Sequence, residues 1–212
     1  NMHWGHAVSK DLIHWEELPD ALYPDHLGTM YSGSAVTDYE NTAGYNRDNV
    51  PAMIVAYTAA SPDKQVQCIA YSLDNGRTFT KYPENPVIDS KHIWNSIDTR
   101  DPKVFWYKPG KHWVMVLNER DGHSIYISSN LKEWTYQSHI TGFWECPELF
   151  ELPIDGDPNN TKWVMYGATG TYMLGSFNGK VFKPEMGKYQ YTTGSIYAAQ
   201  TFTNMPDGRR IQ

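Results

Sequence analysis

The chain has 212 residues, enough for one domain or a piece of a larger one, and its formal net charge of −6 with a pI near 5.7 provides no basic stripe for nucleic acid. No window of about 18 apolar residues predicts a membrane span. Only Cys68 and Cys146 are present, so no disulfide framework or four-cysteine zinc site is indicated, and neither a metal nor another cofactor is expected.

The N-terminal segment MHWGHAVS (2–9) alternates apolar and polar residues, as a strand does. His3 and His6 are three residues apart, and strand side chains at an odd separation point to opposite faces, so both are expected to be structural. No methionine precedes Asn1, and GRRIQ (208–212) reads as a strand that has just begun. We therefore expect the sequence to be an excerpt of a longer protein.

A pattern of strand residues, a serine, a turn of Asp, Asn or Gly, and an aromatic residue occurs four times. The four segments are AVSKDLIHW (7–15), AYSLDNGRTF (70–79), ISSNLKEW (127–134) and GSFNGKVF (175–182). Their final aromatic residues lie about 50 to 65 residues apart, a spacing that fits four-stranded propeller blades better than a β-sandwich. No stretch shows an apolar period of 3.6 over three turns, so an all-β fold with almost no helix is predicted.

A second repeat contains two carboxylates. RDPKVFW (100–106) and ECPELFEL (145–152) each open an early strand of a predicted blade, so Asp101 and Glu145 occupy matching parts of successive blades. The first strand of every blade lines the central channel of a propeller, and equivalent positions therefore meet at one mouth of it. Glu145 stands in an otherwise apolar, aromatic stretch, where an unpaired carboxylate is expensive to ionise. The alternatives are a strand whose polar positions face water, or a structural glutamate satisfied by a nearby arginine.

Five ordered segments resemble family 32 glycoside hydrolases, which include invertases, inulinases and levanases. They are NMHWGHAVSKDLIHWEELPDALYPD (1–25), YSGSAV (31–36), RDPKVFW (100–106), ECPELF (145–150) and YAAQTF (197–202). The resemblance implies a five-bladed β-propeller, usually followed by a β-sandwich. Residues 1–212 would form a partial catalytic domain, from about the end of the first blade to part of the fourth, with the last blade and any β-sandwich outside them.

The resemblance also implies roles for individual residues. Glu145 matches the family's general acid/base, and Asp101 matches its transition-state stabiliser. A glutamate beside Trp144 and Cys146 is partly desolvated and can hold a proton for the leaving oxygen, whereas Asp101 next to an arginine should stay ionised. The residues that match the lining of the fructose subsite are Tyr31, Ser32, Arg100 and Tyr197.

One part of the family pattern is missing. Family members attack with an aspartate in a Trp-Met-Asn-Asp-Pro-Asn-Gly motif that this sequence lacks, and two subsite tryptophans, expected just before Asn1 and just after Gln212, are missing too. The Asp-Pro-Asn run in DGDPNNT (155–161) is predicted to be a turn between two strands. These residues therefore carry two of three catalytic carboxylates, and we expect them to be inactive by themselves.

The predicted activity is retaining hydrolysis of terminal β-D-fructofuranosyl bonds in levan, inulin or sucrose. Residues 41–44, Asn-Thr-Ala-Gly, look like the Asn-Thr-Ser-Gly loop of inulinases and levanases, although an ordinary hairpin loop has the same composition. Enzymes that act on polymers are usually exported, so an extracellular or periplasmic location is expected. The sequence leaves the oligomeric state open.

Three alternatives come from other classes. An arabinan-degrading glycosidase shares the five-bladed architecture, but the ordered WGHAVS, RDP and ECPELF segments disfavour it. A non-catalytic fructan-binding relative is disfavoured by the presence of Asp101 and Glu145. A scaffold of the Trp-Asp repeat type would show Gly-His and Trp-Asp signatures about 40 residues apart, and these are not found.

Overall fold

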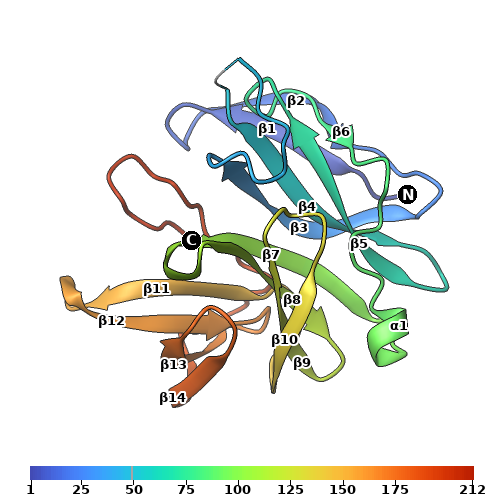
Figure 1. The fold of residues 1–212 in the computed structure, drawn as a ribbon. Coiled ribbons are helices and arrows are strands. Elements are labelled where there is room, and N and C mark those ends of the chain that lie inside the picture. The colour runs from blue at the N-terminus through green and yellow to red at the C-terminus, as the bar shows by residue number, and fades with distance from the viewer. Residues whose placement is uncertain (49) are drawn as a thin grey trace.

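The computed structural model describes residues 1–48 and 50–212, with the side chains of all of these except residues 92 and 93, and consists almost entirely of antiparallel strands (Figure 1). The first sheet contains β1 (Trp4–Ser9) and β2 (Trp15–Leu22). The second contains β3 (Thr29–Asp38), β4 (Ala52–Ala60), β5 (Gln65–Ser72) and β6 (Thr80–Lys81). The third contains β7 (Thr99–Tyr107), β8 (His112–Glu119), β9 (Gly122–Ser128) and β10 (Thr135–Thr141).

The fourth sheet contains β11 (Glu148–Ile154), β12 (Asp157–Tyr166), β13 (Thr171–Phe177) and β14 (Phe182–Gln190). The only helical elements in the described residues are the single turns α1 (Lys91–Trp94) and η1 (Lys108–Gly110), as the sequence predicted. Within each sheet the strands pair in chain order, which is the arrangement of a propeller blade. The fourth blade has all four strands, so the chain reaches further than the partial fourth blade that was expected.

The repeated serine motif forms the hairpin between the last two strands of each blade. In the second blade the Ser72 hydroxyl accepts a hydrogen bond from the Gly76 amide (2.8 Å), and Asp74 Oδ1 accepts from the Thr78 amide (2.9 Å). Side chains of this kind replace backbone partners in a turn. The equivalent turns carry Ser9 with Asp11, Ser128 with Asn130, and Asn178.

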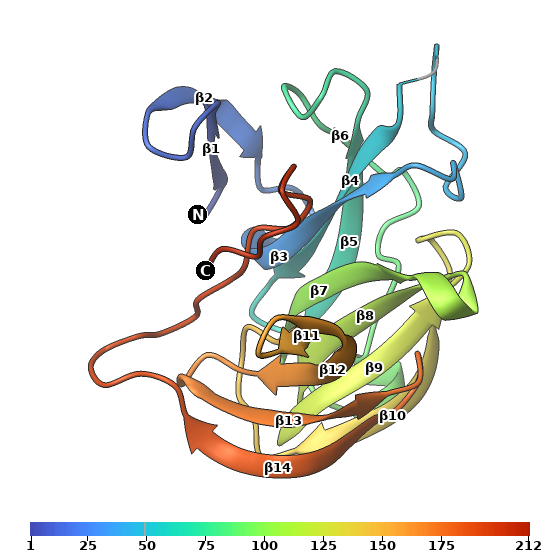
Figure 2. The same ribbon diagram turned by 90° about the vertical axis from the view of Figure 1, so that its left-hand side faces the viewer.

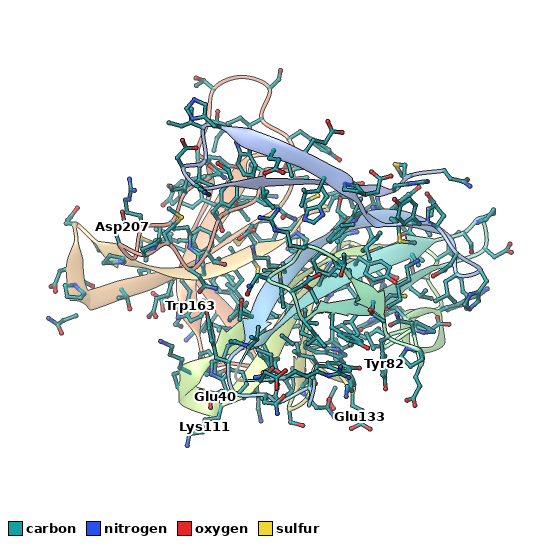
Figure 3. The ribbon with its side chains drawn as sticks, turned by 90° about the horizontal axis from the view of Figure 1, so that it is seen from above. Glu40, Tyr82, Lys111, Glu133, Trp163 and Asp207 are labelled. Carbon is teal, nitrogen blue, oxygen red and sulfur yellow. The ribbon has the colours of Figure 1, made fainter. Side chains whose placement is uncertain are left out.

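Alternate residues of the inner strands of the third blade pack against opposite neighbours, because this blade is covered by the second blade on one face and by the fourth on the other. On β8, Val114 and Val116 belong to the core shared with the fourth blade, whereas Met115 belongs to the core shared with the second. This two-sided burial explains why the segment reads as an almost continuous apolar run. The ring of Trp163, which Figure 3 labels, has its centre 4.8 Å from that of Phe177. Both rings lie between the third and fourth blades, and Figure 2 shows these two blades stacked.

The first strands of the blades lie at the centre of the molecule and contact one another. The Ser34 hydroxyl of β3 donates to the Pro102 carbonyl oxygen (2.8 Å) and accepts from the Val104 amide (2.9 Å), both on β7. Lys103 Nζ of β7 lies 2.6 Å from Glu148 Oε1 of β11, and both side chains are buried. These contacts place the starts of β3, β7 and β11 at the same mouth.

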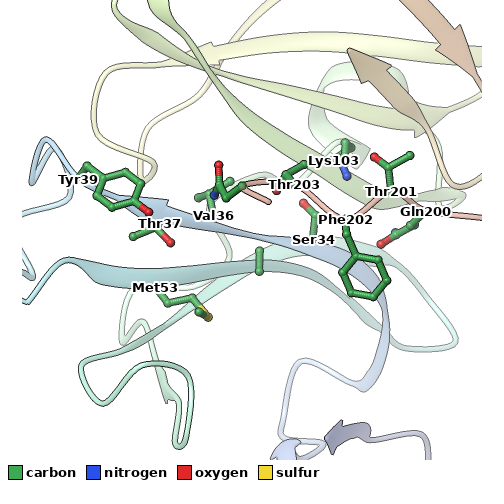
Figure 4. A pocket seen from close by; sticks show the side chains of 12 residues that line it. Ser34, Val36, Thr37, Tyr39, Met53, Lys103, Gln200, Thr201, Phe202 and Thr203 are labelled. Carbon is green, nitrogen blue, oxygen red and sulfur yellow. The ribbon is translucent and has the colours of Figure 1, made fainter. Parts of the chain in front are cut away.

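The segment after β14 returns to this centre. The Thr201 hydroxyl donates to Glu148 Oε2 (3.0 Å), and Gln200 Nε2 donates to the Gly33 carbonyl oxygen (3.0 Å). Residues 200–204 and β3 enclose a cavity of about 410 Å³, in which Figure 4 shows Lys103 and Thr201 side by side. The returning segment therefore connects the second, third and fourth blades.

The loop at residues 41–44 lies at the other end of β3 and joins two blades. Its Thr42 hydroxyl accepts a hydrogen bond from Trp113 Nε1 (2.7 Å), and its Ala43 carbonyl oxygen accepts one from Lys132 Nζ (2.6 Å). Ser32 and Asp38 are separated by about 20 Å of extended strand. The loop therefore contacts the third blade at the end opposite the mouth.

Asp74 offers a test of the hairpin chemistry. Replacing it with alanine in the intact protein should lower the free energy of unfolding by about 1 kcal/mol, as for the loss of a helix cap, with solvent screening limiting the charge contribution. Hydrogen bonds from Ser72 and Thr78 lower the pKa of Asp74. The stabilisation is therefore present above the ordinary pKa of aspartate and disappears as the pH falls below it.

Urea denaturation of the wild type and the variant at neutral and acidic pH measures this effect. Asp63→Ala, at an exposed position in another turn, is the control and should change little. The interpretation would be contradicted if the difference in free energy of unfolding between the wild type and Asp74→Ala grew as the pH fell.

Candidate active site

The six residues that the sequence singled out lie around one cavity of about 430 Å³. They come from three blades and the returning segment: Tyr31 and Ser32 from β3, Arg100 and Asp101 from β7, Glu145 from the loop before β11, and Tyr197 from the segment after β14. The other lining residues are Met2, His3, Trp4, Met30, Cys146 and Ala198. The starts of the inner strands and the returning segment thus bring together six residues that lie up to 166 positions apart in the sequence.

Asp101 is the more deeply buried of the two candidate carboxylates, with 4% of its side chain exposed. Its Oδ2 accepts hydrogen bonds from the Cys146 amide (3.0 Å) and thiol (3.6 Å), and Arg100 Nε lies 3.9 Å away. Burial raises the pKa of Asp101, and the Cys146 amide and Arg100 oppose this effect. The sequence predicted the arginine, but the larger influence is the loss of water.

Glu145 lies in a bend and not inside a strand. It has a backbone φ of +49°, its side chain is 17% exposed, and its Oε1 forms an ion pair with Arg100 Nη2. The preceding Trp144 is 42% exposed, and the Arg100 guanidinium lies 5.7 Å from its ring centre. Glu145 is thus only partly desolvated, and the arginine partner of the alternative interpretation is present at the same time as the cavity.

Arg100 is shared among several carboxylates. Besides Glu145 and Asp101, it forms an ion pair with Asp98 and donates from Nη1 to Gln65 Oε1 (3.3 Å). The planar guanidinium carries five donors in a fixed geometry, so one arginine can orient several acceptors at once. Arg100 is therefore both part of the cavity lining and the group that sets the position of Glu145.

Of the six lining residues that the sequence did not single out, two hydrogen-bond to residues that it did. The Cys146 thiol donates to Asp101, and burial raises its pKa to about 12, so the thiol keeps its proton. Cys146 follows Glu145 and occupies the place that Asp101 has in the preceding repeat. This correspondence could have identified Cys146 as a lining residue from the sequence. Trp4 donates from Nε1 to the Tyr31 carbonyl oxygen (2.7 Å), and no local pattern indicated that contact.

The two N-terminal histidines have other partners. His3 Nδ1 lies 2.8 Å from Asp20 Oδ2, and the His6 ring lies 6.0 Å from that of Phe79. Among the described side chains there is no group of three or more His, Cys, Asp or Glu that could hold a metal ion. No helix in residues 1–48 and 50–212 has the length and apolar character needed to cross a membrane.

The Asp-Pro-Asn run after β11 is remote from the cavity lining. The prediction that this run is a turn was wrong: Asp155 and Gly156 form the hairpin turn between β11 and β12, and Asp157, Pro158 and Asn159 already belong to β12. Asp157 Oδ1 accepts a hydrogen bond from the Asn159 amide (2.9 Å), which is a local contact. This aspartate therefore does not supply the third carboxylate of the cavity.

Comparison with known proteins adds a second line of observation. Residues 1–212 match the glycosyl hydrolases family 32 N-terminal domain. The chain is 48% identical to a levanase from Bacillus subtilis, over 99% of this chain and 34% of the levanase. It is 38% identical to invertase 1 from Saccharomyces cerevisiae, over 95% of this chain and 42% of the invertase. The chain thus spans less than half the length of these relatives.

Solved structures show the same similarity. The fold matches a fructofuranosidase from Schwanniomyces occidentalis complexed with fructose, with a TM-score of 0.86 and 37% identity over 97% of this chain and 44% of that one. It also matches an exo-inulinase from Aspergillus awamori, with a TM-score of 0.85 and 34% identity over 98% of this chain and 50% of that one. An endo-arabinase from Bacteroides thetaiotaomicron gives 0.61 at 16% identity, which is a likeness of fold alone.

The burial of Asp101 predicts how it affects stability. Replacing it with asparagine in the intact protein should leave the melting temperature unchanged or raise it, because no buried carboxylate then has to ionise. A raised pKa means that the stabilising contribution of Asp101 is present below its ordinary pKa and is lost as the pH rises through the raised pKa.

Calorimetry from about pH 4 to pH 7, a range that begins at the ordinary pKa of aspartate, measures both proteins. The variant should gain melting temperature relative to the wild type as the pH rises. The opposite trend would show that the Cys146 and Arg100 contacts outweigh burial.

Proposed function

This chain belongs to glycosyl hydrolase family 32, and from that membership we propose that the protein containing it hydrolyses terminal β-D-fructofuranosyl bonds in fructans or sucrose. The observation that carries the proposal is the single cavity around Tyr31, Ser32, Arg100, Asp101, Glu145 and Tyr197. The fold of these residues is the all-β propeller of the family's solved structures. The partner that we propose is therefore a β-fructoside.

In the proposed mechanism Glu145 is the general acid/base. It protonates the departing glycosidic oxygen and then removes a proton from the incoming water, which is the double role of such a group in a retaining glycosidase. Its partial exposure beside the cavity gives a leaving group access to the carboxyl. Arg100 orients this carboxyl through their ion pair.

Asp101 is the proposed transition-state stabiliser. Its burial and its contacts with the Cys146 amide and thiol keep the carboxylate in one orientation, so the protein does not have to reorganise as positive charge develops on the fructosyl ring. Tyr31, Ser32 and Tyr197 supply apolar surface and hydroxyls for a small polar ligand. The family's nucleophile motif is not among these 212 residues, so the proposal assigns the nucleophile to a segment outside them.

The alternatives predict different behaviour. An arabinan-degrading enzyme is disfavoured because similarity to the endo-arabinase is limited to fold at 16% identity. A non-catalytic fructan-binding relative would have no need of a buried Asp101 beside a partly exposed Glu145. An extracellular or periplasmic location is proposed because relatives that are 37% identical, such as one from Meyerozyma guilliermondii, are extracellular exo-inulinases.

Glu145→Gln in the intact protein tests the assignment. The amide is nearly the same size but cannot donate the proton, so hydrolysis of sucrose or inulin should slow by about 10²- to 10⁴-fold with an unchanged melting temperature. Glu151→Gln, at an exposed glutamate on the neighbouring strand β11, is the matched control and should keep the full rate. A loss of less than about tenfold in Glu145→Gln would contradict the role of general acid.

The stereochemistry of the product gives an independent test. A retaining mechanism needs the Glu145 carboxyl and a nucleophile about 5 to 5.5 Å apart, and it releases fructose first as the β-anomer. Proton NMR during the first minutes of hydrolysis distinguishes the anomers before they equilibrate. An α-anomer that appears first would exclude the double displacement.

A further inference from the structure

A buried pair of polar side chains next to Glu145 has no part in the proposed chemistry. Asn118 is the penultimate residue of β8, His123 is the second residue of β9, and the two face each other across the hairpin with no exposed surface. Burial lowers the pKa of His123 to about 3, so its ring is neutral. Within the described part of the chain, Asn118 Nδ2 has no hydrogen-bond partner, and the only hydrogen-bonding group that acts on the His123 ring is the Glu145 backbone, which opposes the lowering of the His123 pKa. Burying polar groups with so few partners costs free energy, and what contacts the two side chains do make involve the segment around Glu145.

In the described part of the chain, the Asn118 side chain makes one hydrogen bond, and it is to the backbone of the proposed general acid. Its Oδ1 accepts from the Glu145 amide at 2.8 Å. Glu145 and Cys146 have φ values of +49° and +42°, a left-handed conformation that side-chain-bearing residues adopt only when their surroundings impose it. The Asn118 contact is one of the interactions that impose it.

His123 supports the same bend from the other side. Its ring stacks on Phe143, with centroids 5.2 Å apart and planes 14° apart, two residues before Glu145. The Ala168 amide donates to the carbonyl oxygens of Trp144 (2.9 Å) and Glu145 (3.0 Å). Residues 143–146 are thus fixed at their amide, carbonyl and aromatic groups by the third and fourth blades.

The preceding blade contains an equivalent arrangement. Thr58 on β4 faces Gln67 on β5, and the Thr58 hydroxyl accepts from the Asp101 amide (3.0 Å) and donates to Gln67 Oε1 (2.7 Å). Asp101 is also left-handed, with a φ of +65°. In both blades, therefore, a facing pair from the second and third strands binds the backbone amide of the candidate catalytic carboxylate on the next blade.

We propose that Asn118 and His123 are positioning residues for Glu145, which keep its backbone in the left-handed conformation that directs the carboxyl into the cavity. The inference rests on the proposed function of Glu145. A displaced general acid harms reactions that need leaving-group protonation more than reactions whose leaving group departs unaided. The fall in rate that follows loss of the Asn118 contact should therefore depend on the leaving group. A fall in rate caused only by lower stability would be the same for every leaving group.

The experiment measures kcat/KM of the intact protein for two substrates. One is sucrose, and the other is an aryl β-D-fructofuranoside whose leaving group is an acidic phenol. Asn118→Leu removes the acceptor at similar size and should lower kcat/KM for sucrose by at least about tenfold, through kcat, and for the aryl substrate by less than about threefold. Asn118→Thr copies Thr58 and should recover most of the sucrose activity. Thr42→Val, which removes a hydrogen bond at the far end of the blades, should lower the melting temperature and leave both rates unchanged.

Wild-type rates in Asn118→Leu, or an equal loss on both substrates, would overturn the inference. If Asn118→Leu does not fold, Gly167→Ala replaces it, because a methyl group there would lie 2.9 Å from the Trp144 carbonyl oxygen and 3.2 Å from that of Glu145. The same selective loss on sucrose is expected, and wild-type or equally reduced rates would again overturn the inference. Glu145→Gln separates the two proposals. If this variant stays active, the proposed role of Glu145 is wrong. If it is inactive, that role stands, and the results for Asn118→Leu then test the positioning role alone.

Discussion

The buried ion pair between Lys103 and Glu148 connects the inner strands of the third and fourth blades. The side chains are 8% and 0% exposed, and Thr201 supplies two further hydrogen bonds to Glu148. Replacing such a pair by apolar residues is often neutral, but removing one partner costs about 3 to 5 kcal/mol, because it leaves an unpaired charge without water. A slip of β7 against β11 would have the same effect, so the pair specifies how these strands align. Lys103 follows Asp101 by two residues and Glu148 follows Glu145 by three, so this alignment also determines the distance between the candidate carboxylates.

Four residues that line the cavity have a left-handed backbone. Asp101, Glu145, Cys146 and Ala198 all have positive φ, and each lines the same cavity. A left-handed residue with a side chain costs about 1 to 2 kcal/mol, and neighbouring blades compensate through bonds such as Ala198 amide to Ala168 carbonyl oxygen (3.0 Å). The bends turn side chains out of the regular alternation of a strand, which would otherwise direct neighbouring residues to opposite faces. This explains how Arg100 and Asp101, adjacent in sequence, can both line one cavity.

The sequence predicted the features that depend on local chemistry or on a repeat. The Ser-turn-aromatic motif required only the hydrogen-bonding habits of Ser, Asp and Asn, and it identified four hairpins correctly. The meeting of Asp101 with Glu145 followed from their matching places in successive blades. In contrast, two features depend on strand register across blades: Arg100 is shared by three carboxylates, and Asn118 faces His123. The sequence NERDGH (118–123) predicts only a hairpin. The 41–44 loop was related to substrate choice because its residues resembled a known loop, but strand direction places it at the opposite end.

Strand direction also divides the molecule into two ends with different chemistry. The inner strands begin at the cavity, so the turns between the third and fourth strands and the loops after the first strands all lie at the far end. There the contacts are well satisfied: Asp38 accepts from the amides of Thr42 and Ala43, and His112 Nε2 lies 3.1 Å from the Gly179 carbonyl oxygen of the next blade. At the cavity end, by contrast, lie a buried carboxylate whose pKa is raised, Asp101, and the buried polar pair Asn118 and His123. The turns and loops that join the blades at the far end are thus separated from the residues that line the cavity by about 20 Å of strand, so the two ends can vary separately.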